Sequence, residues 1–169
     1  MYFSSSKNKR ANAVTDSLTV LTVMFVFGIL SIVGYMVFDD LNAGVQSDPN
    51  LGSTAKGISS DLYDRYPATL DGAFLTAFVL MVIFAIVSVF VIDTHPIYFI
   101  LAVVLLIAVF VVGGFLANAF NDIVTTPGIS EYANEFTATG FIMGNLIQVI
   151  LGVVMVMLVA LFAKFRSLS

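Results

Sequence analysis

The sequence predicts an all-α integral membrane protein with four transmembrane helices and a short interfacial helix in the first outer loop. The first observation is length: the stretches 17–38, 72–92, 96–121 and 136–163 contain no charged side chain. About 20 apolar helical residues cross the hydrocarbon core of a bilayer, so each stretch is long enough to span it. The second is composition, since 59% of the 169 residues are hydrophobic and 11% are charged, against about 25% charged in soluble domains.

The first span follows a Ser-rich basic tail. We expect the tail over residues 1–13 and the span over 14–38, with hydroxyl and carboxyl side chains near residue 16 capping its start. An acidic outer loop follows over 39–71. Apolar residues spaced three and four apart predict a short helix near 54–66 in that loop, lying on the membrane surface or on a partner and ended by Pro67.

The rest of the chain predicts two hairpins. We expect the second span over 72–92, and a tight inner turn over 93–96 that joins it to the third span at 97–121. A turn this short requires the two spans to be antiparallel neighbours. A second outer loop at 122–139 leads to the fourth span at 140–163.

The basic residues mark one side of the membrane. Five of the seven flank the first and last spans, in the tails 1–13 and 164–169. Because Lys and Arg accumulate in cytoplasmic segments, both termini are predicted to be cytoplasmic at synthesis. The two outer loops carry nine acidic residues against two basic ones. This asymmetry indicates topology, or alternatively a surface that docks a basic partner or collects cations.

Each predicted span has a face of small residues, and the fourth adds amides. Small residues allow helices in a membrane to approach closely, and an amide in hydrocarbon needs a partner. We therefore predict helix packing, within the bundle or between subunits, rather than a polar pathway. The predicted packing residues are Gly140, Gly144, Asn145, Gln148, Gly152, Asn118, Asn121, Gly28, Gly34, Gly113, Gly114, Ala73 and Ala77.

Two pairs of nearby residues could have a chemical role. His95 beside Asp93 forms either a proton-relay pair or, as is more usual in an interfacial turn, a cap or headgroup contact. Asp39 and Asp40 are adjacent, so on a helix their carboxylates diverge and make a poor cage for a divalent cation. The chain has no cysteine and one histidine, which excludes thiolate and multi-histidine metal sites.

Five segments of the chain together carry a resemblance: 35–42, 71–74, 92–99, 117–120 and 141–145. With these segments the chain resembles small four-span membrane proteins that are encoded beside capsid genes of tailless icosahedral viruses with an internal membrane. The resemblance covers residues 14–163 and implies a structural protein of the virion membrane, without catalytic residues.

The sequence thus predicts a non-enzymatic structural or assembly protein that packs through its small-residue faces. Its expected location is a host cell membrane, a virion internal membrane, or both. Its expected partners are the lipid bilayer and other membrane or capsid proteins, in a homo- or hetero-oligomer, without a cofactor, a metal or sequence-specific nucleic-acid binding. The alternatives are a small pore former of the holin type, a transporter, or an accessory subunit of a membrane enzyme.

Overall fold

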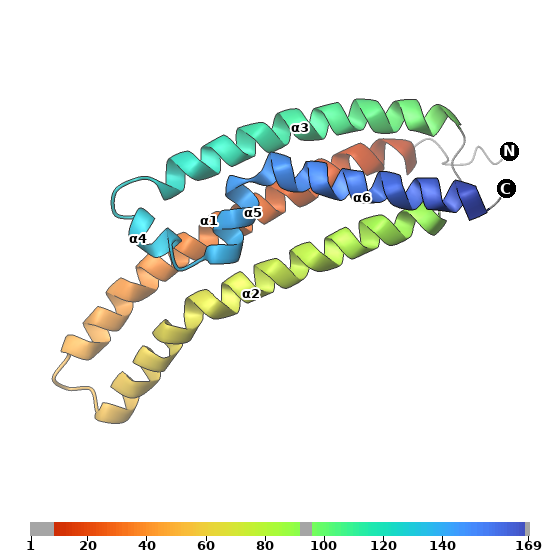
Figure 1. Ribbon diagram of the computed structural model, residues 1–169. Coiled ribbons are helices and arrows are strands. Elements are labelled where there is room, and N and C mark those ends of the chain that lie inside the picture. Colours follow the sequence, from red (N-terminus) through yellow and green to blue (C-terminus); the bar gives the residue numbers. More distant parts are fainter. Residues whose placement is uncertain (1–8, 92–95, 168–169) are drawn as a thin grey trace, which may run out of the picture.

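The computed structural model describes residues 9–91 and 96–167, and every regular element in these ranges is an α-helix (Figure 1). Four helices are long and two are short. They are α1 (Lys9–Ser47), α2 (Ser53–Val91), α3 (Pro96–Val124), α4 (Ser130–Ala133), α5 (Thr137–Gly144) and α6 (Leu146–Ser167).

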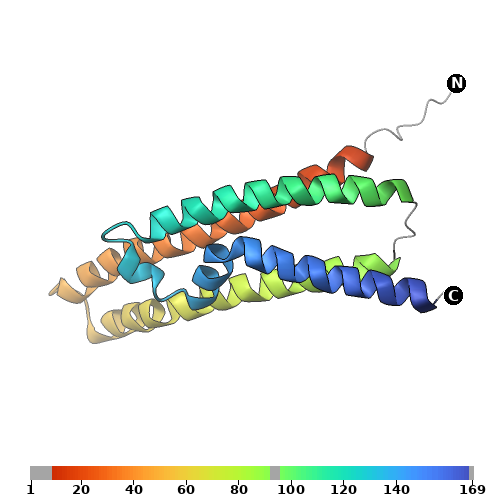
Figure 2. The same cartoon turned by 45° about the horizontal axis from the view of Figure 1, so that its top comes forward.

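The four long helices form an elongated bundle. α1 and α2 pack as an antiparallel hairpin, α3 packs beside α1, and α6 contacts both α2 and α3 (Figures 1 and 2). The start of α1 and the end of α6 lie at one end of the bundle, which we call the inner end. The hairpin turn and the short helices α4 and α5 lie toward the other, outer end.

Three helices, α1, α2 and α3, have stretches long and apolar enough to cross a membrane. The predicted fourth span is not one straight helix. α5 and the described apolar part of α6 meet at 79° and supply a fourth apolar span if they are counted together. The break falls at Asn145, which has a non-helical backbone with φ −116° and ψ 29°.

The predicted helix near 54–66 forms, but it is neither short nor separate. It is the first part of α2, which continues through Pro67 into the apolar stretch. The prediction that Pro67 ends a helix is therefore wrong. Proline removes one backbone hydrogen bond and bends a helix, and Figure 1 shows α2 changing direction in its yellow stretch. Packing against α1 holds the helix on both sides of that bend.

The outer parts of α1 and α2 are joined by polar contacts. The Lys56 ammonium donates to the backbone carbonyl of Gln46 at 2.7 Å, and the Gln46 amide donates to the carbonyl of Lys56 at 2.8 Å. One turn further in, the Ser59 hydroxyl donates to the Asn42 side chain at 2.8 Å. These reciprocal bonds set the register of the hairpin, so that Phe38 and Tyr35 of α1 stack on Tyr63 of α2.

One layer of side chains fixes the relative heights of the helices. A Cβ placed on Gly28 of α1 would lie 3.8 Å from the rings of Phe74 of α2 and Phe120 of α3, and 3.0 Å from Thr139 of α5. The fully buried side chains Ile32, Phe136 and Met143 lie near this layer or outward of it. The core of the protein is therefore in its outer half.

The predicted inner turn at 93–96 lies outside the described residues apart from Pro96, which begins α3. His95 and Asp93 are among the residues not described, as are the ends of both predicted tails.

Candidate functional site

The polar groups of the described chain converge at the outer end, where α4 and α5 fold against α1 and α2. Asp71 of α2 makes the best-defined contact there. Its two carboxylate oxygens accept hydrogen bonds from the backbone N–H groups of Ala138 and Thr139, at 2.8 and 2.7 Å. Both donors belong to the first turn of α5, whose N–H groups have no partner within the helix.

Asp71 thus caps a helix to which it is not adjacent in sequence. The residue at the cap position of α5 itself, Phe136, makes no side-chain cap hydrogen bond. A carboxylate also offsets the partial positive charge of a helix N-terminus. The contact therefore anchors the N-terminal turn of α5 on α2.

The first turn of α5 also contains a buried hydroxyl without a partner. Thr139 is 1% exposed, and its Oγ1 has no hydrogen-bond partner in the described part of the chain. Its methyl group faces Gly28, where an added Cβ would be only 3.0 Å away. Close backbone approach at Gly28 is what allows α5 to enter the bundle.

Six aromatic rings form a second cluster, outward of the Gly28 layer. Tyr35 is 7% exposed and lies at its centre. Its ring stacks on Tyr63 with centroids 4.9 Å apart and on Tyr66 at 5.7 Å. Tyr132 and Phe136 meet it edge-on at 5.7 and 6.0 Å, and Phe38 completes the cluster by stacking on Tyr63 and Tyr66. We call these six residues the tyrosine cluster.

Asp39 links the tyrosine cluster to α4. Its carboxylate accepts a hydrogen bond from the Tyr132 hydroxyl at 2.8 Å. This bond raises the pKa of Tyr132 above its ordinary value, with smaller contributions from desolvation and from the charges of Asp39, Asp40 and Glu131. The neutral phenol is therefore the form that the folded protein stabilises.

The sequence predicts that Asp39 and Asp40 make a poor cation site, because adjacent carboxylates diverge on a helix. Within the described residues, no three His, Cys, Asp or Glu side chains group closely enough to hold a metal ion. Asp39 instead accepts the Tyr132 hydroxyl. In this arrangement the chemistry of Asp39 is that of a structural acceptor.

A shallow hollow of about 350 Å³ lies between the outer end of α3 and the α4–α5 segment. Its wall combines apolar groups with uncharged amides and hydroxyls. The lining residues are Phe120, Asn121, Val124, Thr125, Ser130, Ala133, Asn134 and Gly140. The hollow contains no acid, base or nucleophile pair arranged for catalysis.

The predicted small residues divide into two groups. The first group packs against a neighbouring element. A Cβ on Gly113 would lie 3.1 Å from Ile150, one on Gly114 would lie 3.4 Å from Ile147, and one on Gly34 would meet the Tyr66 hydroxyl. Gly28 packs on Thr139 as described, and a Cβ on Gly144 would lie 3.3 Å from the Asn121 side chain.

The second group faces outward. No atom would lie within 4 Å of a Cβ on Gly140 or Gly152. Ala73, Ala77, Asn118 and Gln148 are exposed. Asn121 is also exposed, but its side chain lies beside Gly144 and belongs to the first group. Among the described residues, no hydrogen bond joins Asn145 or Gln148 to Asn118 or Asn121, and the Asn145 amide donates to the carbonyl of Phe141 at 2.9 Å within its own turn.

Sequence reasoning missed the roles of Asp71 and of the tyrosine cluster. In the sequence, Asp71 directly precedes the apolar run of the second span, a position typical of the residue that opens a helix. The spacing of Tyr63 and Tyr66, which places both on one helix face, is a signal for the cluster. No local signal connects Asp71 to α5.

No protein-family model, curated protein or solved structure matches this chain. The helices and their apolar lengths define the class as a helical integral membrane protein. Any finer function must be argued from the residues themselves.

Proposed function

We propose that this chain is a non-enzymatic structural or assembly protein of a large membrane complex, in the most specific form a component of a virion internal membrane. It crosses the membrane four times, with the bent α5–α6 pair as the fourth crossing. Its termini are cytoplasmic at synthesis, because the inner ends of the helices border the basic tails. The virion assignment rests on the sequence resemblance described above.

The observation that carries the proposal is the projecting hairpin formed by residues 39–71. Eight charged residues exclude this segment from the hydrocarbon core, namely Asp39, Asp40, Asp48, Lys56, Asp61, Asp64, Arg65 and Asp71. Residues 53–71 of α2 alone extend about 28 Å at 1.5 Å per residue. The hairpin therefore reaches well beyond the membrane surface.

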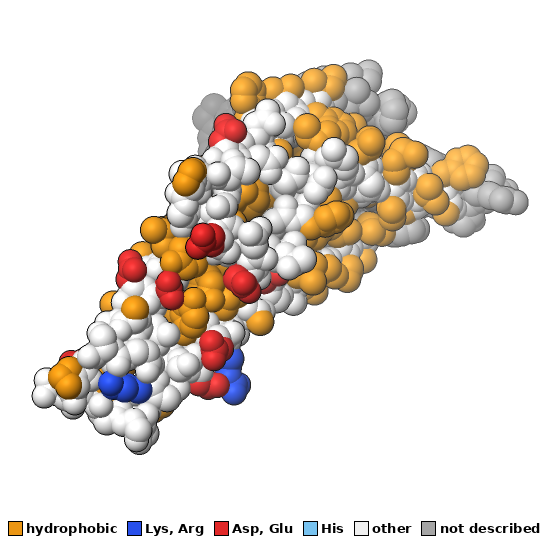
Figure 3. Space-filling model, turned by 60° about the vertical axis from the view of Figure 1, so that its left-hand side comes forward, with side chains coloured by type: hydrophobic (Ala, Val, Ile, Leu, Met, Phe, Trp, Pro, Cys, Tyr) orange, Lys and Arg blue, Asp and Glu red, His pale blue; other side chains and the backbone are white. Residues whose placement is uncertain are grey.

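The hairpin presents both charge and apolar surface. Leu41, Ile58 and Leu62 are 59%, 58% and 54% exposed in this charged segment. Figure 3 shows acidic and apolar side chains together on the surface of the outer end. Apolar side chains within a polar rim are typical of protein-binding surfaces, so the hairpin supports a role in binding other proteins.

Purification of the native assembly tests this role. Replacing Ile58 and Leu62 together with Lys should leave membrane insertion intact and remove the proteins that co-purify with the wild type. A matched control replaces Ser53 and Thr54, which are also exposed in α2, with Lys. Retention of every partner by the Ile58/Leu62 variant would contradict the proposal.

A second candidate function, a solute transporter, is favoured by the broken span. Discontinuous helices and uncharged polar linings occur where transporters bind substrates, and Asn121 and Gly140 line the hollow beside the break at Asn145. Solute flux or single-channel current from the purified protein in liposomes would favour this function. We expect neither, because the inner half of α6, from Val153 to Leu161, is entirely apolar.

A further inference from the structure

The outward face of α6 carries an amide at a depth where lipid cannot satisfy it. Gln148 is exposed and has no hydrogen-bond partner among the described residues. Its neighbours Ile147 and Ile150 pack beside Gly114 and Gly113 of α3, which sets the height of Gln148 in the bundle. Gln148 therefore lies about 12 Å inward of Asp122 along α3, at 1.5 Å per residue.

This depth is inside the hydrocarbon core. Asp122 and Asp71 both lie just outward of the layer formed by Phe120, Phe74 and Gly28, so the two carboxylates mark one level near the outer membrane surface. A glutamine side chain is too short to reach back from Gln148 to that level. In hydrocarbon, an amide without a partner is strongly unfavourable.

Gln148 belongs to a continuous exposed stripe. Opposite the bundle, α6 exposes Leu151, Met155, Leu158 and Phe162, at 51%, 58%, 48% and 70%. With Gln148 these residues are spaced three, four, three and four apart, which is the spacing of a left-handed helix–helix seam. Gly152 lies beside them with open space at its Cα.

We propose that this stripe pairs with the same stripe of a second copy of this chain, with Gln148 hydrogen-bonded to its counterpart. All copies insert with the same topology, so the two-fold axis is parallel to the membrane normal and identical residues meet at identical depth. An amide has both donors and acceptors, so Gln148 is complementary to itself. A second copy of the chain is then the first identified partner in the proposed assembly. The inference rests on the proposed function for the location of the chain in a membrane.

Gly152 completes the fit. It is one helical turn inward of Gln148 on the same face, and a missing side chain there allows the two α6 helices to approach closely. The rest of the seam is apolar, so the amide pair fixes its register. A heteromeric partner would need a polar group at this same height, whereas a second copy supplies it by symmetry.

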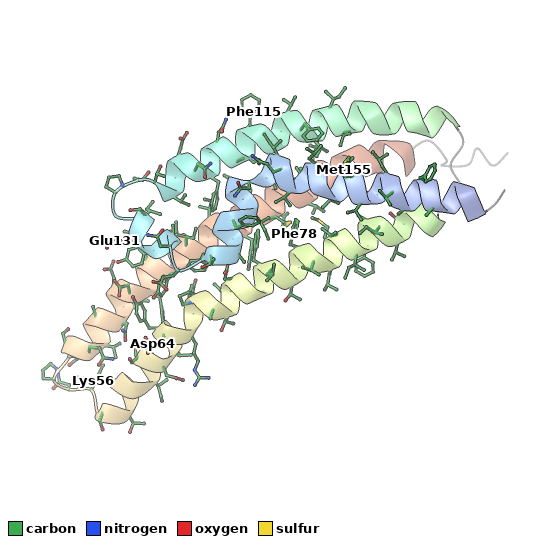
Figure 4. All side chains as sticks on the ribbon, viewed as in Figure 1. Lys56, Asp64, Phe78, Phe115, Glu131 and Met155 are labelled. Atoms are coloured by element: carbon green, nitrogen blue, oxygen red, sulfur yellow. The ribbon has the colours of Figure 1, made fainter. Side chains whose placement is uncertain are left out.

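Oxidative cross-linking in membranes tests the seam directly. The chain has no cysteine, so Met155→Cys places a single thiol in the stripe while leaving Gln148 intact. Phe115→Cys is the matched control, since Phe115 is 72% exposed and points away from the bundle on α3 (Figure 4). We expect a covalent dimer from Met155→Cys that persists when the protein is diluted with excess lipid, and little from Phe115→Cys.

A second measurement isolates the amide. Adding Gln148→Leu to Met155→Cys should raise the dissociation constant of the dimer by roughly 3- to 20-fold, the range for interhelical hydrogen bonds in membranes. Gln148→Asn, which keeps an amide, should retain more affinity. Asn118→Leu removes an exposed amide from α3 and should have no effect.

Two results would overturn the pairing. They are equal cross-linking of the two cysteine variants and a monomeric mass for the wild type in mild detergent. The cross-linking assay uses isolated protein in lipid. A monomer in that assay would overturn self-pairing. It would not contradict the assembly role, which the Ile58/Leu62 variant tests separately.

Discussion

In the outer half of the bundle, side chains from α1, α2, α3, α5 and α6 meet in a buried core, whereas in the inner half nearly all of the described side chains are exposed or half-buried. Phe74, Phe120 and Phe136 are at most 1% exposed. Among the described side chains of the inner half, in 18–27, 78–88, 106–112 and 149–160, Leu21 alone is buried. The apolar window of α2 is only 6% buried inside the bundle.

The difference indicates that contacts within the chain stabilise the outer half, whereas the inner half depends on its surroundings. The outer half combines ring stacking, the Asp71 cap and the Tyr132–Asp39 hydrogen bond. The inner half has apolar faces that lipid or other helices must cover. Substitutions should therefore destabilise the folded protein strongly in the outer half and weakly in the inner half.

The largest effect is expected in the outer core. Phe74→Ala should lower the free energy of unfolding by about 3 to 5 kcal/mol, because it leaves a cavity among rings that cannot collapse. Unfolding in mixed micelles, followed by circular dichroism, measures this change. Phe84 is 69% exposed on the same helix, so Phe84→Ala should change stability by no more than about 0.5 kcal/mol. Similar losses for the two variants would refute the contrast between the halves.

The Asp71 cap should give the next largest effect. Asp71→Ala removes the acceptor of two backbone N–H groups in a partly buried site, at a cost of about 1 to 3 kcal/mol. Protection of the α5 amides in hydrogen exchange reports it locally. Asp64→Ala, an exposed carboxylate on α2, is the control and should leave that protection unchanged. If α5 keeps full protection in Asp71→Ala, the cap does not hold the helix in place.

Two glycine substitutions test the comparison by adding a single methyl group at a packed and at an open position. Gly28→Ala inserts a methyl group 3.0 Å from Thr139 and should cost about 1 to 2 kcal/mol. Gly57→Ala meets no atom within 4 Å and should stabilise α2 by up to about 1 kcal/mol through helix propensity. The same micelle assay measures both changes, and a stabilising Gly28→Ala would show that α5 does not approach α1 closely.

The smallest effect is expected from Tyr132→Phe, which removes the hydrogen bond to Asp39. The pKa of Tyr132 is raised in the folded state, so its stabilising contribution is fully present below the ordinary pKa of 10.0 and is lost as pH rises through the folded pKa. The stability difference between wild type and Tyr132→Phe should therefore shrink above pH 10. A difference that grows with pH in this range would be the opposite of the expected sign.

The sequence was sufficient to predict the helical class because charge-free length is a local property. It predicted the helix near 54–66 but not its continuation, because Pro67 is a strong local stop signal that packing against α1 overrides. The break at Asn145 was missed for the same kind of reason. The first turn of α5 is anchored by Asp71, which contacts it from 67 residues away, and no pattern within residues 136–163 encodes that contact.

The glycines of the candidate site show the same limit. The spacing of small residues in the sequence shows which face of a helix they form. It does not show which element packs against that face. Gly113 turned out to pack on Ile150, whereas Gly152 of the predicted span-4 face meets open space. Which glycine lies inside the bundle depends on the rotation of each helix, and that rotation is set by contacts distant in sequence.

The cap between α2 and α5 also has a consequence in time. Asp71 is translated 67 residues before Ala138, which at ordinary elongation rates is an interval of roughly 3 to 13 s. During that interval the α1–α2 hairpin can form its own contacts. The carboxylate of Asp71 lacks its two N–H donors, because α5 has not yet been synthesised. A chain that ends before Phe136 therefore lacks both that buried ring and the α5 N–H groups that Asp71 binds, so its outer core stays open beside Phe74.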